Sequence, residues 1–171
     1  LNAIRVQLGA GPFCLVCLFA SPDADFPALS QAAPGRFGGA DVLACTTAGE
    51  LGKNGYETGK IVAVAFPSDL FAVESFAIDG LDRLDAQAVT DELIQRRMGL
   101  SRRARDMASE FAFLMVDGLS LGEETLTAAL AAGLGPMPLF GGSSGDGTAF
   151  RATWLARNGA IRQNAALLAL V

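Results

Sequence analysis

Two apolar segments of strand length set the strongest limit on how this chain can fold. Phe13–Ala20 is a run of eight apolar residues and Ala165–Val171 is a run of seven. A strand with one face in water alternates apolar and polar residues, and neither segment does so. Each segment is therefore predicted to be a strand buried on both faces, within a sheet that other layers cover.

Segments with helical periodicity separate the predicted strands. Phe26, Leu29 and Ala33 follow Asp25, a good N-cap, and predict a short helix. A second helix is predicted over 83–98, and a third runs from a capping-box pair, Ser120 and Glu123, to residue 134. The other predicted strands are 41–45, 60–66, 71–78, 111–116, 137–140, 150–157 and 160–171, with hairpin turns at 67–69 and 158–159.

The order of these elements occurs twice, over residues 13–98 and 111–171. In each copy a strand, a helix and a second strand lead to a loop ending in glycine and an acid, and a hairpin follows. The two loops are Thr47–Glu50 and Ser143–Asp146. The sequence thus predicts one α/β domain over residues 1–171, with layered mixed sheets, helices outside and two pseudo-symmetric repeats. Ligands of open α/β sheets bind beyond the carboxyl ends of the strands, so we expect the two loops to face one another around a ligand.

Composition excludes several classes of function. The formal net charge is −5, whereas a nucleic-acid-binding protein needs a basic face. The chain has no histidine, which excludes a histidine-based catalytic triad, histidine-ligated zinc and histidine-ligated haem. No spacing of acidic residues matches a metal-binding loop, so we expect neither a metal nor another cofactor. The longest apolar run is far shorter than the roughly 18 residues that cross a bilayer, so no membrane span is expected.

Cysteine usage and the chain ends give two further expectations. Three cysteines are an odd number in a chain that is not rich in disulfides, which favours a reducing, cytoplasmic setting. The chain begins with Leu1 and ends in an apolar strand. We therefore expect it to be a segment of a longer protein.

The two loops and their neighbours supply the candidate ligand-binding residues. Hydroxyl groups, flexible glycines, carboxylates and one arginine together suit a small zwitterion or another polar metabolite. The same residue types also build tight turns, so a purely structural role is the alternative. The candidates are Thr46, Thr47, Gly49, Glu50, Asp117, Gly142, Ser143, Ser144, Asp146 and Arg151.

Two other classes of function remain open. A hydrolase or transferase would use Ser143 or Cys45 as its nucleophile, and a hydroxyl nucleophile without histidine needs a lysine base. The lysines are Lys53 and Lys60, and the sequence places neither beside Ser143. The third class is a structural or interaction module that binds no ligand.

Four segments together resemble the FIST N-terminal domain: Phe19–Asp23, Cys45–Leu51, Val116–Glu124 and Phe140–Gly147. The resemblance implies an α/β fold and a non-catalytic sensory domain of signal-transduction proteins that binds small ligands such as amino acids. It also implies two partners, a following FIST C-terminal domain and a downstream signalling module. Some members of the family bind haem, but this chain offers no histidine to ligate it.

Overall fold

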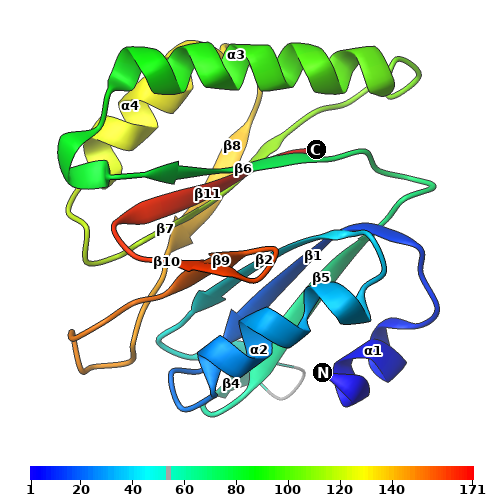
Figure 1. Cartoon of the computed structure of the whole chain (residues 1–171), viewed down its shortest axis with the longest axis vertical. Coiled ribbons are helices and arrows are strands. Elements are labelled where there is room, and N and C mark those ends of the chain that lie inside the picture. Colours follow the sequence, from blue (N-terminus) through cyan, green and yellow to red (C-terminus); the bar gives the residue numbers. More distant parts are fainter. Residues whose placement is uncertain (53–54) are drawn as a thin grey trace.

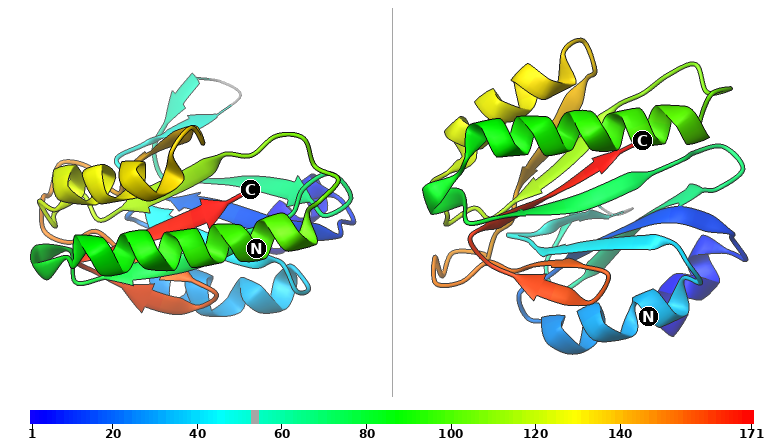
Figure 2. Two further views of the ribbon diagram at one scale, coloured as in Figure 1. Left: turned by 90° about the horizontal axis from the view of Figure 1, so that it is seen from above. Right: turned by 45° about the horizontal axis from the view of Figure 1, so that its top comes forward.

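The computed structural model describes residues 1–52 and 55–171 and shows four layers, with helices on the two outsides and two sheets between them (Figures 1 and 2). Helices α3 (Ala86–Arg103) and α4 (Glu123–Leu134) cover one sheet. Helices α1 (Asn2–Leu8) and α2 (Phe26–Ala32) cover the other. The predicted α/β class, with mixed sheets and helices outside, is confirmed.

The first sheet has five strands and the second has four. The first follows the order β10 (Ala160–Arg162), β9 (Leu155–Arg157), β2 (Asp41–Thr46), β1 (Phe13–Ala20) and β5 (Ile61–Pro67). The second follows the order β6 (Glu74–Asp79), β11 (Ala165–Leu170), β7 (Ala112–Val116) and β8 (Leu139–Ser143). A separate hairpin pairs β3 (Glu50–Gly52) with β4 (Gly55–Glu57), and short 3-10 helices span Pro34–Arg36 and Leu81–Arg83.

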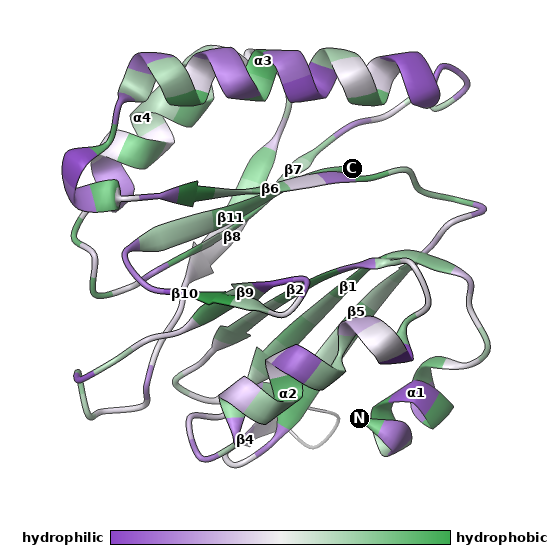
Figure 3. Cartoon of the chain, viewed as in Figure 1, coloured by the Kyte–Doolittle hydropathy of each residue, from purple (hydrophilic) through white to green (hydrophobic). Residues whose placement is uncertain are grey.

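The two apolar segments form strands inside these sheets and are buried on both faces, as predicted. In β1, Val16 and Leu18 face the layer of α2, while Leu15 and Cys17 face the second sheet. In β11, alternate residues likewise face α3 and α4 or the first sheet. Figure 3 shows the consequence, since β1 and β11 carry no hydrophilic stretch whereas hydrophilic and hydrophobic residues alternate along α3.

The predicted repeat is only partly visible in the topology. Strands β2, β1 and β5 have the same order and relative directions as β8, β7 and β11. The expected hairpins do not follow the pattern, because β6 joins the sheet of the second half and the β9–β10 hairpin joins the sheet of the first. Residues 67–69 therefore connect strands of different sheets, and the predicted hairpin turn there is wrong. The structure does not confirm two complete repeats.

Several element boundaries also differ from the predictions. Helix α1 is an element that the sequence did not predict. Its residues Ile4 and Leu8, together with the preceding Leu1, pack against the core between α2 and the first sheet. Helix α3 begins later and ends later than residues 83–98. Helix α4 begins after Gly122 rather than at a Ser120 cap, because the Ser120 hydroxyl donates to the Asp117 carbonyl instead.

Strand boundaries near the second loop differ as well. Strand β8 continues through Gly142 and Ser143, which were predicted to lie in a loop. A Cβ on Gly141 would lie 1.9 Å from the Leu114 carbonyl oxygen, so glycine here permits close approach within the sheet. The segment 150–157 is a strand only from Leu155, and the final segment is interrupted between β10 and β11. The hairpin turn at Asn158 and Gly159, both with positive φ, is confirmed.

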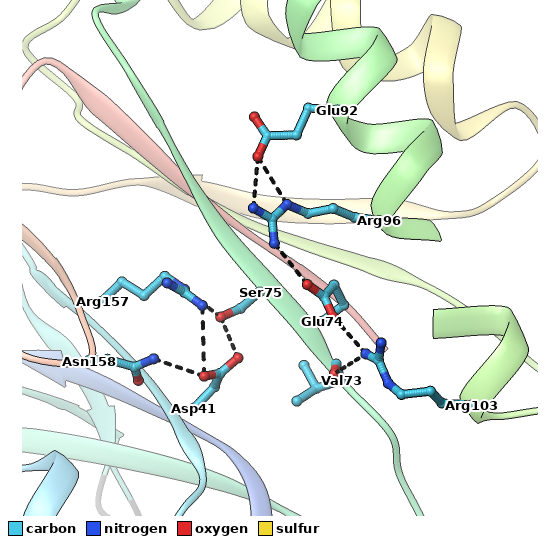
Figure 4. Close-up of polar contacts among 9 residues, drawn as sticks. All are labelled: Asp41, Val73, Glu74, Ser75, Glu92, Arg96, Arg103, Arg157 and Asn158. Atoms are coloured by element: carbon cyan, nitrogen blue, oxygen red, sulfur yellow. Dashed lines mark hydrogen bonds and ion pairs between the residues drawn. The ribbon is translucent and has the colours of Figure 1, made fainter. Parts of the chain in front are cut away.

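Polar side chains of β6, β2 and β9 connect the two sheets (Figure 4). The Ser75 hydroxyl of β6 donates to Asp41 of β2 at 2.6 Å and accepts from the Arg157 side chain of β9 at 2.8 Å. Ser75 is 1% exposed, so these bonds satisfy a buried hydroxyl and link the two sheets. Next to it, Glu74 pairs with Arg96 and Arg103 of α3, which links the second sheet to its helix.

Within the described ranges, no helix has both the length and the apolar character needed to span a membrane.

Replacing Ser75 with alanine should lower the free energy of unfolding by about 1–3 kcal/mol, because Asp41 and Arg157 then lose a buried partner. Denaturant unfolding measures the change. Ser109→Ala, at an exposed loop residue with no recorded side-chain bond, is the matched control and should change stability little. Equal effects of the two substitutions would contradict a stabilising role for the Ser75 bridge.

Candidate functional site

The loops that follow β2 and β8 are in direct contact. Strands β1 and β2 are parallel, as are β7 and β8, so each pair delivers its following loops at one end of its sheet. The Gly145 N–H donates to the Thr46 carbonyl at 3.0 Å. A Cβ on Gly145 would lie 3.0 Å from the Ala48 nitrogen, so glycine lets the two loops approach this closely. The predicted facing of the two loops agrees with this contact.

A hollow of about 270 Å³ lies beside the contact. It is bordered by the loops that follow β1, β2 and β8 and by the segment that precedes β5. Ligand pockets for drug-sized molecules span roughly 300–1,000 Å³, so a hollow of this size suits a smaller metabolite. The lining residues are Ser21, Pro22, Asp23, Ala48, Gly49, Thr58, Asp146, Gly147, Thr148 and Ala149.

Asp146 shapes the rim of this hollow. Its carboxylate accepts the backbone N–H groups of Phe150, Arg151 and Ala152, at 2.9, 2.6 and 3.0 Å. These bonds, led by that from Arg151, lower the pKa of the Asp146 carboxyl, so it stays ionised at neutral pH. Asp23 adds a second carboxylate on an exposed loop, and no lysine or arginine is among the lining residues.

Gly49 lines the hollow under the β3–β4 hairpin. The Tyr56 hydroxyl on β4 donates to the Ala48 carbonyl at 2.8 Å, which folds the hairpin over this loop. A Cβ on Gly49 would lie 2.1 Å from that hydroxyl oxygen, and the φ of Gly49 is +146°. Glycine is therefore required here by both the neighbouring ring and the backbone.

Thr47 and Glu50 support the loop without lining the hollow. The Thr47 hydroxyl donates to one oxygen of the Glu50 carboxylate, and the Lys60 N–H donates to the other at 3.2 Å. Glu50 is 3% exposed, so the bonds satisfy a buried charge. The pair fixes the start of the hairpin relative to β5.

Thr46, Ser144 and Asp117 are buried and bonded within the fold. The Thr46 hydroxyl accepts the Trp154 N–H, and the Ser144 hydroxyl accepts the Gly118 N–H. None of the three lines the hollow. The structure thus places them as supports of the loops rather than as parts of the hollow.

The Asp117 carboxylate is the most heavily used of these groups. It accepts the Leu119 N–H at 3.0 Å, the Thr153 hydroxyl, and the Asn164 N–H at 2.5 Å. Asp117 follows β7, while Thr153 and Asn164 flank the β9–β10 hairpin. This carboxylate therefore links the end of β7, in the second sheet, to the segments on both sides of the β9–β10 hairpin, in the first sheet.

Three other candidates lie away from the hollow. Gly142 and Ser143 are on the exposed strand β8, where the Ser143 hydroxyl donates to Glu123 at 2.8 Å. Arg151 is exposed and does not line the hollow. Of the ten predicted residues, only Gly49 and Asp146 line it.

Sequence reasoning missed most of the lining residues. Ser21, Pro22 and Asp23 belong to the first of the four segments that carried the family resemblance, which was the available signal. Thr58 and Thr148 had no comparable signal, because isolated threonines in turn-rich segments are common.

The buried cysteines offer little reactivity. Burial raises the pKa of Cys45 to about 12, so its thiol stays protonated and Cys45 is a poor nucleophile. Cys17 is buried in the same layer, and all three cysteines are free. Lys53, one of the two lysines considered as a base, lies outside the described residues. Across residues 1–52 and 55–171, no group of three or more acidic or cysteine side chains is arranged to hold a metal ion.

Comparison with known proteins adds one match. The family described as FIST N domain matches residues 14–171, nearly the whole chain. No curated protein and no solved structure matches the chain.

Asp117→Asn should lower the free energy of unfolding by about 2 kcal/mol, because an amide nitrogen would then face a buried donor. For a chain of this length that corresponds to a fall of roughly 4–8 °C in melting temperature. Asp106→Asn, at an exposed residue with no recorded side-chain bond, is the control. A melting temperature equal to that of the control would refute the assigned role of Asp117.

Asp146→Asn should weaken the acid dependence of stability. The folded-state pKa of Asp146 is depressed, so its contribution is present above the unfolded-state pKa and is lost as pH falls through the folded value. Thermal unfolding of parent and variant, compared from neutral pH down to about pH 2, isolates this contribution. We expect the stability difference between them to shrink as the pH falls below about 4; a difference independent of pH would contradict the assignment.

Proposed function

Because the chain belongs to the FIST N domain family, a family of sensory domains in signal transduction, we propose that it senses a small polar metabolite bearing an amino group. The hollow beside Gly49 and Asp146 is the proposed binding site. The proposed ligand class is free amino acids, and the proposed role is recognition without catalysis.

The charge of the lining carries this proposal. Asp23 and Asp146 are its charged side chains, and no cationic side chain lines the hollow. A carboxylate-only ligand would meet repulsion there, whereas an ammonium group would gain a charge-assisted hydrogen bond. Asp146 Oδ1 accepts one recorded bond, from Phe150, and so retains capacity for a further donor.

The rest of the lining can accommodate the opposite end of an amino acid. Ser21, Thr58 and Thr148 contribute hydroxyl groups that donate as well as accept. Gly49 and Gly147 present backbone without side chains. Hydroxyl and backbone N–H groups of this kind can donate hydrogen bonds to the ligand carboxylate.

We propose the β3–β4 hairpin as the element that responds to the ligand. It lies next to the hollow, and Tyr56 joins it to the loop after β2 through its bond to Ala48. A ligand changes the output only if it binds one position of such an element more tightly than another. The proposed recipients of the change are a following FIST C-like domain and a downstream signalling module. The three free cysteines of this chain favour a cytoplasmic setting for the domain.

A thermal-shift experiment tests the site. Each common amino acid is tested beside the corresponding carboxylic acid that lacks the α-amino group. We expect at least one amino acid to raise the melting temperature and its deaminated partner to have no effect, because only the ammonium group pairs with the acidic lining.

Variants then locate the binding. Asp23→Asn should weaken the affinity by about tenfold, the equivalent of one charge-assisted contact. Asp69→Asn, at an exposed aspartate on a different loop, should leave it unchanged. The proposal fails if no amino acid stabilises the protein, or if the two variants bind a stabilising amino acid equally well.

A further inference from the structure

Strand β8 is an open edge of the second sheet. In the order β6-β11-β7-β8 it pairs with β7 on one side, and no described element pairs with the other. Its residues Phe140 to Ser143 are exposed. The outward backbone groups of an edge strand are free to bond to another chain.

The other sheet edges carry features that discourage such pairing. Strand β6 bears Glu74 and Asp79, and these acids form ion pairs with arginines. Strand β10 has three residues and ends in a charged one, Arg162. Strand β5 lies against α1 and β3. Strand β8 has no charged residue, no proline and no register shift, so it lacks the usual protection.

We propose that β8 pairs antiparallel with β8 of a second copy of this chain, about a two-fold axis at Gly141. This pairing would join the four-stranded second sheet of each copy into one continuous sheet across a symmetric dimer. A two-fold interface requires a surface that complements itself. In the β8 sequence, Leu-Phe-Gly-Gly-Ser, a large residue and a glycine lie on either side of the central Gly141, so the pairing would place each large residue opposite a glycine.

The complementarity rests on Phe140 and Gly142. An axis at Gly141 places Phe140 of each copy opposite Gly142 of the other. The Phe140 ring is 52% exposed although it stacks on Phe111 at 5.2 Å, so part of it lacks a neighbour. A Cβ on Gly142 would meet nothing within 4 Å, which leaves open space for the ring of the second copy. Aromatic residues commonly cover glycines on adjacent strands in this way.

The residues beyond the strand ends are compatible with the same register. Antiparallel pairing brings Leu139 of the second copy to the end of β8 at Ser143, beside the 118–123 loop. Glu123, which holds Ser143, would lie at opposite ends of the ladder in the two copies, so these carboxylates would not oppose each other.

The mass of the chain in solution tests the proposal. Sedimentation across a wide range of chain concentrations should show a reversible monomer–dimer equilibrium. Gly142→Lys should raise the dimer dissociation constant by about tenfold or more, because the lysine side chain would occupy the space that the Phe140 ring of the second copy needs. Val64→Lys, at an exposed residue on the β5 edge, is the matched control and should leave the constant unchanged.

Amide hydrogen exchange of the unmodified chain gives a second measurement that needs no variant. Exchange at residues 139–143 should slow as the chain concentration rises, while exchange on β5 stays the same. A monomer at all concentrations overturns the proposal. A dimer that survives Gly142→Lys in a folded protein, or that shows no added protection on β8, overturns it as well.

Discussion

Burial of β1 and β11 on both faces is the constraint on which the rest of the structure depends. Each strand sends alternate side chains to the layer between the sheets and to its own helix layer. Two sheets must then stack against one another, and each needs helices on its outer side. The loops after the parallel strands β1, β2, β7 and β8 meet at one end as a consequence, and the candidate site forms there.

Many polar groups near this end hold the loops rather than line the hollow. Asp117 joins the β7 loop to the segments around the β9–β10 hairpin, and Glu50 joins the β2 loop to β5. A buried carboxylate has to find donors, and backbone N–H groups of nearby turns provide them. Few polar groups are left to line the hollow. Asp146 has both roles, because its bonds hold its own loop and the residue also lines the hollow.

The sequence predicted those features that follow from periodicity. Double burial of Phe13–Ala20, the layered α/β class and the Asn158-Gly159 hairpin all agree with the structure, because local patterns determine them. Strand partnership was harder, since nothing local shows that β6 pairs with β11 rather than β5. The role of two glycines was equally hard to predict. Gly141 lies against the Leu114 backbone and Gly49 against the Tyr56 ring, and both contacts join residues that are separated in the sequence. The sequence also could not show which acids line the hollow, because Glu50 and Asp117 are bonded within the fold whereas Asp146 lines it.

The exchange of strands between the halves has a consequence for how the domain can come apart. Strand β6 of the first half completes the sheet of the second, and the β9–β10 hairpin of the second completes the sheet of the first. Neither half is a closed body, so cutting the chain between them would leave each fragment with an unmatched sheet. Loss of order in one sheet should spread to the other, and the domain should melt as a single cooperative unit.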